Sequence, residues 1–219
     1  ILLEVVLILD CVDGQLARAK ECSSDLGRLL DGIAGYIIYL AVLTGVVIGF
    51  NQDYTTLAVF GLVTILRGIA YDYFKLTMIT MIQNGYDGSI KEILDTHSKI
   101  SQNNSTIWKV YFYYLQFQSF VFGGRFISFD KFLVYGKENS KDYLLSSTDK
   151  KKYQKEVRPL IFAWSWNGVD LPLFLLVLMS LFGVVESCLF PVVCFLSFQF
   201  ILTMVYHRTQ SQRFFNTKG

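Results

Sequence analysis

Three aspartates near the start of the chain have the type and spacing to bind divalent metal ions. Asp10 and Asp13 are three residues apart, and Asp31 follows beyond a polar stretch. A helix turns by about 100° per residue, so Asp10 and Asp13 share one helix face. A short polar loop joins antiparallel neighbouring helices, which lets Asp31 converge with them. Carboxylate oxygens are hard ligands that suit Mg²⁺ or Mn²⁺, and these ions in turn suit a diphosphate substrate.

Small residues and one arginine follow the same helical spacing. Gly14 and Ala17 lie on the face of the first two aspartates, and Gly27 lies one turn before the third. Small side chains leave room for a ligand, and the Arg18 guanidinium is suited to bidentate binding of phosphate oxygens. The alternative is helix packing through small residues, with Arg18 as a positive charge beside the membrane. The complete spacing favours the ligand site.

The elements that must position these residues are predicted to be membrane-spanning helices. Hydrophobic residues make up 53% of the 219 residues and charged residues 17%, which excludes disordered and low-complexity classes. We therefore expect an all-α polytopic membrane protein, a helical bundle. An apolar start and four longer apolar runs predict five transmembrane helices in this fragment, at 1–9, 29–50, 54–82, 160–185 and 188–206. Carboxylates in such helices usually face a polar cavity and serve function.

The positive charges predict how these helices are oriented. Eighteen of the twenty Lys and Arg residues lie in 18–28, 86–158 and 207–219. Segments rich in Lys and Arg stay in the cytoplasm, so we expect an integral membrane protein with the aspartate site facing the cytoplasm. Because the chain starts inside an apolar run, we expect a missing N-terminal segment and about six spans in the parent protein. A net charge of +2 gives no indication of nucleic-acid binding.

The polar region 86–158 is predicted to be a cytoplasmic or interfacial insertion. It separates the motif helices of 1–85 from the last two spans and basic tail of 159–219. Its aromatic stretch, 108–117, favours a helix lying on the membrane, with a buried helix of a small cytosolic subdomain as the alternative. The basic run 150–155 is suited to attract anionic headgroups, but a positive-inside anchor explains it equally well.

Other polar residues are secondary candidates. Arg67 lies within a span, where it could bind an anionic acceptor or headgroup, or pair with a carboxylate and order the bundle. Asn167, Gly168 and Asp170 interrupt an apolar run just before Pro172. We predict a kink for Gly168 and Pro172, and leave open whether Asn167 and Asp170 line an acceptor cavity.

The histidines and cysteines are expected to have no chemical role. His97 and His207 are interpreted as isolated loop residues. The four cysteines are interpreted as small core residues, neither disulfides nor metal ligands: Cys11, Cys22, Cys188 and Cys194.

The string D-x2-D-G-x2-A-R-x8-G-x3-D at residues 10–31 resembles the signature of the CDP-alcohol phosphatidyltransferases, which are six-span integral membrane enzymes. The motif is long and specific, and the resemblance covers residues 1 to about 85 and the last two spans by pattern only. It implies phospholipid biosynthesis, in which a substituted phosphate passes from a CDP-linked donor, such as CDP-diacylglycerol, to an acceptor alcohol, with release of CMP. It also implies contact with membrane lipids and, since many members are dimers, a homodimer.

Carried over by position, the resemblance assigns a role to each motif residue. It implies two divalent ions, Mg²⁺ or Mn²⁺, held by Asp10, Asp13 and Asp31. It implies a CDP pocket lined by the small residues and the arginine, namely Gly14, Ala17, Arg18 and Gly27.

One motif position departs from the family. The signature ends with a fourth aspartate, a metal ligand and general base, where this chain has Gly35, so no catalytic base is identified. A general base contributes about 10²–10⁴ in rate. Three explanations stay open: a relative that binds nucleotide or metal without activity, an active enzyme with a displaced base, or a sequence change in this copy. A transporter with a carboxylate relay is a further class, but it does not account for the spacing of the small residues and Arg18.

Overall fold

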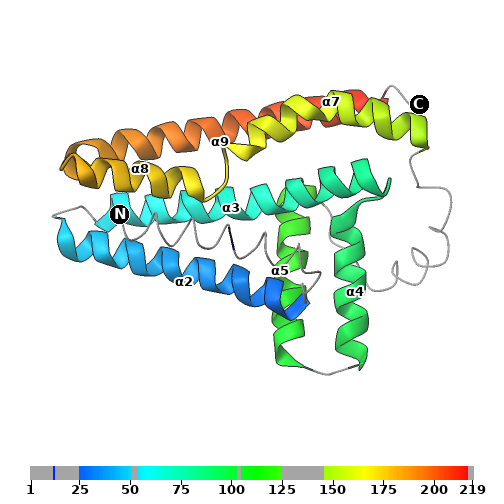
Figure 1. Ribbon diagram of the computed structural model, residues 1–219, viewed down its shortest axis with the longest axis horizontal. Coiled ribbons are helices and arrows are strands. Elements are labelled where there is room, and N and C mark those ends of the chain that lie inside the picture. Colours follow the sequence, from blue (N-terminus) through cyan, green and yellow to red (C-terminus); the bar gives the residue numbers. More distant parts are fainter. Residues whose placement is uncertain (1–11, 13–24, 51–53, 103–104, 125–145, 217–219) are drawn as a thin grey trace. The chain divides into compact units, whose positions relative to one another are not determined.

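The computed structural model describes residues 12, 25–50, 54–102, 105–124 and 146–216, with only the backbone described at 25–33, 36 and 211–216. The described residues are almost all helical and include no strand, which confirms the all-α prediction. Figure 1 shows the helices, which are α2 (Asp25–Gly49), α3 (Tyr54–Gln83), α4 (Gly88–Gln102), α5 (Thr106–Gly123), α7 (Ser147–Ser165), α8 (Asp170–Leu181) and α9 (Val185–Asn216).

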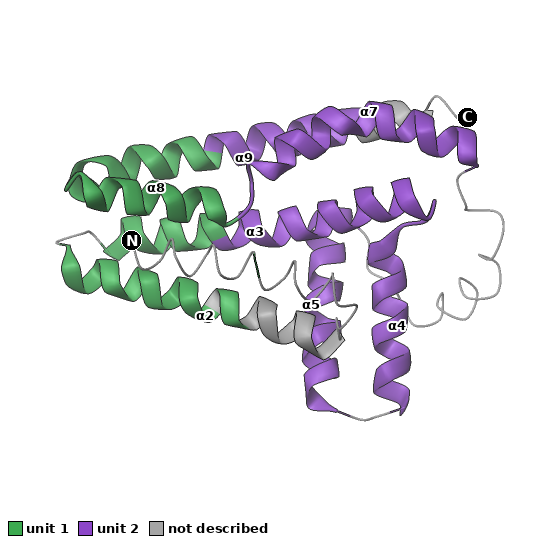
Figure 2. Cartoon of the chain, viewed as in Figure 1, with its two compact units in different colours: residues 1–64, 169–197 green, residues 65–168, 198–219 purple. Residues whose placement is uncertain are grey.

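The chain divides into two compact units (Figure 2). Unit 1 comprises residues 1–64 and 169–197, and unit 2 comprises residues 65–168 and 198–219. The boundary between them passes through α3 and α9, so each of these helices contributes to both units.

Three segments of the described residues are long and apolar enough to cross a membrane: Tyr54–Gln83, Ser147–Leu181 and Val185–Gln210. The described apolar part of α2 is shorter, Ile37–Gly49. The expectation of a polytopic membrane protein is therefore confirmed. The first predicted helix, 1–9, lies outside the described residues, so the count of five remains a prediction.

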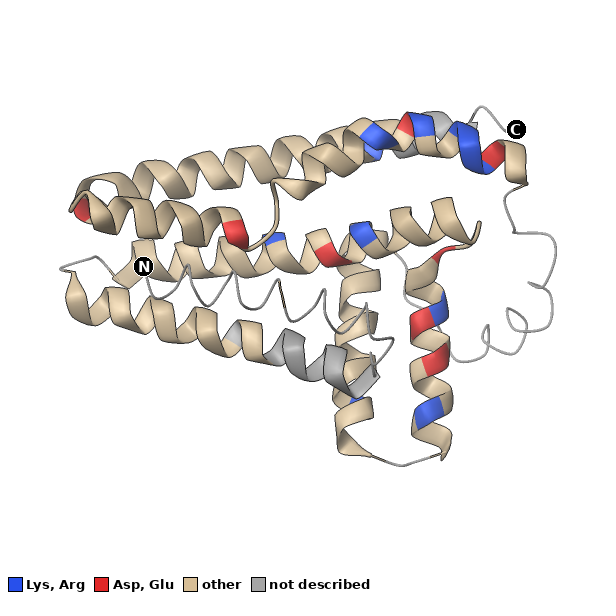
Figure 3. Cartoon of the chain, viewed as in Figure 1, with Lys and Arg blue, Asp and Glu red and all other residues tan. Residues whose placement is uncertain are grey.

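The helix predicted at 160–185 begins earlier and is interrupted. α7 starts at Ser147, after an N-cap at Ser146 whose hydroxyl accepts a hydrogen bond from the Asp149 backbone N–H at 3.2 Å. The basic residues of 150–158 therefore belong to a helix, in the part that precedes Leu160 (Figure 3). The sequence prediction missed this charged part of α7 because hydropathy detects only the apolar part of a helix.

The turn between the last two helices also differs from the expected position at 186–187. α8 ends in a Schellman motif: Val184 N–H bonds to Met179 O at 2.9 Å and Gly183 N–H to Ser180 O at 3.2 Å. Gly183 has φ of 66°, a left-handed conformation that suits glycine. Glu186 already lies in the first turn of α9.

Within unit 1, α2 packs against the first part of α3. Tyr39 and Phe60 are buried, and the Tyr39 hydroxyl donates to the Phe60 carbonyl at 3.5 Å. Gly61 permits this close approach, since a Cβ there would lie 2.9 Å from Leu43 Cδ1. α2 is thereby fixed against α3 by side chains C-terminal to its motif positions.

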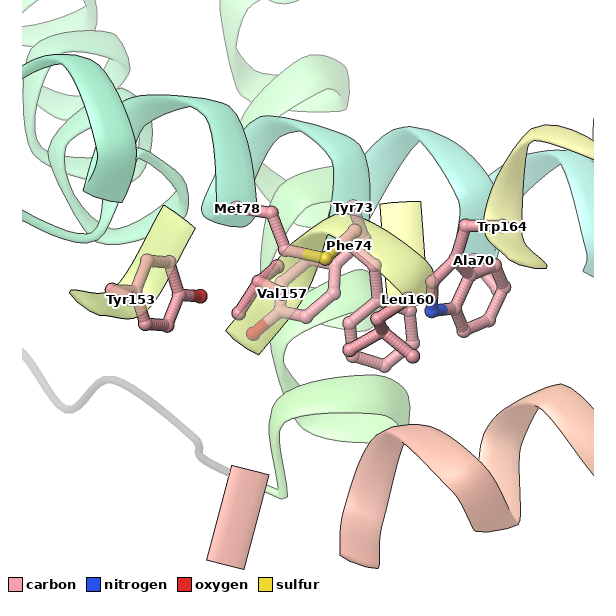
Figure 4. Close-up of a cluster of buried hydrophobic side chains, with 8 residues drawn as sticks. All are labelled: Ala70, Tyr73, Phe74, Met78, Tyr153, Val157, Leu160 and Trp164. Carbon is pink, nitrogen blue, oxygen red and sulfur yellow. The ribbon is translucent and has the colours of Figure 1, made fainter. Parts of the chain in front are cut away.

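The core of unit 2 joins the second half of α3 to α7. Its buried side chains are Ala70, Tyr73, Phe74, Met78, Tyr153, Val157, Leu160 and Trp164 (Figure 4). The rings of Phe74 and Trp164 lie 4.6 Å apart between centroids. This cluster gives the amphipathic α7 its buried face.

Both histidines lie in helices, so their interpretation as isolated loop residues was wrong. The Trp164 Nε1–H donates to His207 Nδ1 at 3.1 Å, and the His207 ring is 4.1 Å from that of Phe74. His97 lies on α4, with its ring 5.9 Å from that of Phe112. A hydropathy pattern missed both helices at these positions, because His97 lies in the polar helix α4 and His207 in the polar C-terminal part of α9.

Two of the cysteines lie among the described residues. Cys188 and Cys194 are both free thiols on α9. Cys194 is exposed, so its interpretation as a core residue was wrong. On a spanning helix, an exposed apolar side chain is a normal surface residue because lipid surrounds it.

Candidate functional site

The first half of the motif lies outside the described residues. This applies to both aspartates, both small residues and the arginine: Asp10, Asp13, Gly14, Ala17 and Arg18. Their predicted convergence on Asp31 therefore remains a prediction.

The second half of the motif lies on α2. This helix is continuous from Asp25 to Gly49 and includes Gly27, Asp31 and Gly35. Residues four apart lie one turn apart on the same helix face, so the three positions form one stripe. The predicted helical spacing of this half is thus present in the backbone.

Nothing in the described surroundings of Gly35 requires a glycine. Its backbone is helical, it is not among the glycines with positive φ, and it is exposed. A Cβ placed on Gly35 meets no described atom within 4 Å. No described atom would therefore clash with the Cβ of another residue at this position.

The donor set of the motif is compatible with divalent metal ions. Its three potential ligands are all carboxylates, whose hard oxygens Mg²⁺ and Mn²⁺ prefer. Among the described residues, no group of three His, Cys, Asp or Glu side chains could hold a metal ion. The backbone at Asp31 is helical, and the position of its carboxylate relative to the other two aspartates remains a prediction.

Arg67 is fully buried on α3 and contacts the interruption between α7 and α8. Its Nη2 donates to the Trp166 carbonyl oxygen at 2.7 Å, and Gln199 Nε2 donates to the same oxygen at 3.3 Å. A carbonyl at a helix break lacks its usual N–H donor four residues later, so these side chains satisfy it. Arg67 therefore holds α3 to this break.

Asn167 forms the second part of the polar contact at the break. It is fully buried, and its Nδ2 donates to Ala163 O and to Thr203 Oγ1, each at 3.1 Å. Thr203 in turn donates to the Gln199 carbonyl at 2.9 Å. The network links α7 to α9 and gives Asn167 a structural role.

The predicted kink is confirmed as an interruption of the helix. α7 ends at Ser165 and α8 begins at Asp170, with Gly168 between them. Pro172 lies in the first turn of α8, where a missing N–H costs little because it would have no intrahelical partner. Asp170 is exposed in the same turn, where a carboxylate favours the helix dipole.

Sequence reasoning missed Gln199 and Thr203. They are four residues apart in a strongly apolar run, and this spacing puts both on one face of α9. A polar pair on one face of a membrane helix indicates contact with another helix. This spacing could have indicated from the sequence that Gln199 and Thr203 contact another helix. Their contacts with residues 166 and 167 depend on the fold and could not have been predicted.

Comparison with protein families adds one finding. A family model described as CDP-alcohol phosphatidyltransferase matches residues 1–119, more than half of the 219 residues. Neither a search of the curated proteins nor one of the solved structures found a significant match. The matched region includes the whole motif, α2, α3, α4 and most of α5.

Proposed function

Since the chain belongs to the CDP-alcohol phosphatidyltransferase family, we propose that it transfers a substituted phosphate from a CDP-linked donor to an acceptor alcohol. The donor is a CDP-alcohol such as CDP-diacylglycerol, and the reaction belongs to phospholipid biosynthesis. The acceptor oxygen forms a new P–O bond, the bond from that phosphorus to CMP breaks, and CMP leaves with the electron pair. The acceptor hydroxyl proton passes to a base or to water.

The observation that supports this proposal most directly is the continuous helix α2. It contains the second half of the motif, with Asp31 and Gly35 one turn apart on one face. The first half, outside the described residues, has the spacing of a matching helix face in the sequence. Two such faces on neighbouring helices would together supply carboxylate ligands to the metal ions.

We assign the motif residues as follows. Asp10, Asp13 and Asp31 hold two divalent ions, Mg²⁺ or Mn²⁺, which when bound neutralise the charge of the diphosphate and of the departing CMP. Arg18 donates to phosphate oxygens. The glycines and alanine leave the volume that cytidine needs: Gly14, Ala17 and Gly27.

Gly35 determines how well the chain catalyses this reaction. It has no side chain to accept the hydroxyl proton, and the family places an aspartate there. Because the other motif residues are intact, we propose an active enzyme whose proton acceptor lies elsewhere. The alternative is a catalytically impaired relative that binds CDP-alcohol and metal as a membrane interaction protein. The absence of the family's aspartate at this position is what motivates the alternative.

Four further assignments belong to this proposal. The site faces the cytoplasm, because Lys and Arg are concentrated on the same side as the motif in the predicted topology. Arg67 remains a candidate contact for an anionic acceptor, as a cation buried within a span. Region 86–158 is an insertion, and the protein forms a homodimer.

Release of CMP tests the proposal. The full-length protein in detergent is supplied with Mn²⁺ or Mg²⁺, CDP-diacylglycerol and a pool of alcohols, beside Gly35→Asp and Asp31→Ala. We expect release by the unaltered protein that Asp31→Ala abolishes, and an increase in Gly35→Asp of up to about 10²–10⁴-fold.

Each other outcome has a definite meaning. Release only by Gly35→Asp identifies an impaired relative with an intact binding site. Release that persists in Asp31→Ala contradicts the metal assignment, and no release from any of the three proteins contradicts the proposed reaction with this donor.

A further inference from the structure

α5 exposes an apolar stripe. Its exposed large side chains recur at intervals of three or four residues, so they lie on one helix face. They are 47–72% exposed: Ile107, Val110, Tyr113, Phe117 and Phe120. Lys109 is the one charged residue exposed among the side chains of α5, all of which are described.

Outside this stripe, α5 buries polar side chains. Gln116, Gln118 and Ser119 are each at most 5% exposed, beside the apolar Phe112 and Leu115. A helix on a water-soluble surface has the reverse arrangement, with its polar residues outside. Polar groups turned inward and apolar groups turned outward are typical of a helix whose surroundings are lipid.

The C-terminal end of α5 contacts α3 at Tyr73 and Phe74. The Phe122 ring lies 6.1 Å from that of Tyr73 and 6.0 Å from that of Phe74, and Gly123 lies against the Tyr73 hydroxyl. At 1.5 Å per residue, the stretch of α3 from Tyr54 to Tyr73 is about 30 Å long, the thickness of the hydrocarbon layer. α5 therefore joins α3 where a crossing that begins at Tyr54 leaves the hydrocarbon.

α4 packs against α5 on the side away from the exposed stripe. The Gly88 N–H at its start donates to Thr80 Oγ1 at 2.8 Å, about 10 Å further along α3 than Tyr73. Ile93 packs with Phe112 and Leu115 in the helix interface. In Figure 1 both helices run across the second half of α3, with α4 nearer its C-terminal end. The stripe on α5, opposite α4, therefore faces back toward the apolar part of α3.

We propose that α5 lies in the plane of the membrane surface and inserts its stripe, Ile107 to Phe120, into the lipid bilayer. Three observations fit contact with lipid. They are the direction of α5, the position of its junction along α3, and its arrangement of buried polar and exposed apolar residues. Lys109 supplies a cation that can reach the headgroups from an otherwise apolar face. Lys99, whose Nζ lies 4.7 Å from the centre of the Trp108 ring, adds a second near the tip of the α4–α5 pair. α5 thus holds α4 at the membrane surface.

Site-directed spin labelling of the full chain in liposomes tests this proposal. Single cysteines replace Val110, Tyr113 and Phe117 in a background without the four native cysteines. The matched controls are Lys91, Asp95 and Ser98, which are exposed on α4 of the same helix pair. Collisions with oxygen report lipid, and collisions with a water-soluble nickel chelate report water.

We expect several-fold higher ratios of oxygen to nickel accessibility at the three α5 positions than at the three α4 positions. Nickel accessibility at α5 equal to that at α4 would overturn the proposal, because it would place the stripe in water. Low accessibility to both reagents, with immobilised labels, would also overturn it, because a protein segment would then cover the stripe.

Discussion

Thr203 shows how a single hydroxyl group stabilises an interrupted membrane helix. It is buried on α9, donates to Gln199 O and accepts from Asn167 Nδ2. Asn167 is the residue at which the chain leaves its helical path between α7 and α8. A buried polar group needs such partners because lipid offers none.

Replacement of Thr203 by the isosteric valine should therefore destabilise the protein. We expect Thr203→Val to lower the free energy of unfolding by about 0.5–1.5 kcal/mol, the usual contribution of one such hydrogen bond. The measurement is unfolding in mixed micelles.

Thr209→Val is the matched control for this change. Thr209 lies on the same helix, is exposed, and donates only locally, to Tyr206 O at 2.9 Å. Its replacement should have a smaller effect. Equal effects of the two substitutions would show that the loss at Thr203 arises from α9 itself and not from the contact with Asn167.

At the scale of elements, the junction of α3 and α4 depends on a glycine. A Cβ on Gly88 would lie 2.5 Å from both Oγ1 and Cγ2 of Thr80 and 2.8 Å from its Cβ. The Thr80 side chain cannot easily rotate away, because its hydroxyl accepts from Gly88 N–H and donates to Leu76 O at 2.7 Å. The β-branched residue on α3 thus requires a glycine at the start of α4.

We expect Gly88→Ala to detach α4 from α3 locally. Overpacking of this kind costs about 1–3 kcal/mol, and hydrogen exchange of the α4 amides should quicken more than that of α3. Gly45→Ala serves as the control, since a Cβ there has no described atom within 4 Å. Unchanged exchange in α4 of Gly88→Ala would refute the proposed role of this glycine.

At the scale of the whole molecule, nucleotide binding should couple to stability. A ligand that binds only the folded state adds about 2.7 kcal/mol at a hundredfold excess over its Kd. We expect CMP with Mn²⁺ to raise the melting temperature of the full-length protein, and CMP with a chelator to have little effect.

Asp13→Ala should abolish this stabilisation, because it removes a proposed metal ligand. Asp72→Ala, which changes an exposed aspartate on α3 outside the motif, should retain it. The absence of any stabilisation by CMP and Mn²⁺ would count against both the transferase and the impaired relative, whereas an effect without CMP release would favour the latter.

Much of the architecture could be predicted from the sequence, but element boundaries could not. Apolar runs located the spans at 54–82 and 188–206, and Gly168 with Pro172 located the break. α7 was placed 13 residues too late, at 160 and not 147, because its first half is charged and only one of its faces is apolar. Hydropathy averages over all faces of a helix and therefore misses such a half.

The candidate site was predictable to a different extent. The motif positions of α2 follow from helical periodicity, which is local, and the backbone there agrees. The contact of Arg67 with Trp166 O joins residues 99 positions apart, and no local pattern contains it. The motif residues before position 25 lie outside the described structure, so their roles remain predictions.

The sequence by itself determined the helical class, the apolar helices at 54–82 and 188–206 and the spacing of the motif, because these depend on hydropathy and on the turn of one helix. Only the tertiary structure decided which face of each helix is covered. α5 is the clearest case, since its aromatic sequence is compatible with either burial or exposure. α4 packs against Phe112 and Leu115 and leaves the stripe on α5 uncovered. Which face of a helix becomes buried depends on where its neighbouring helix lies, and a local sequence does not contain that information.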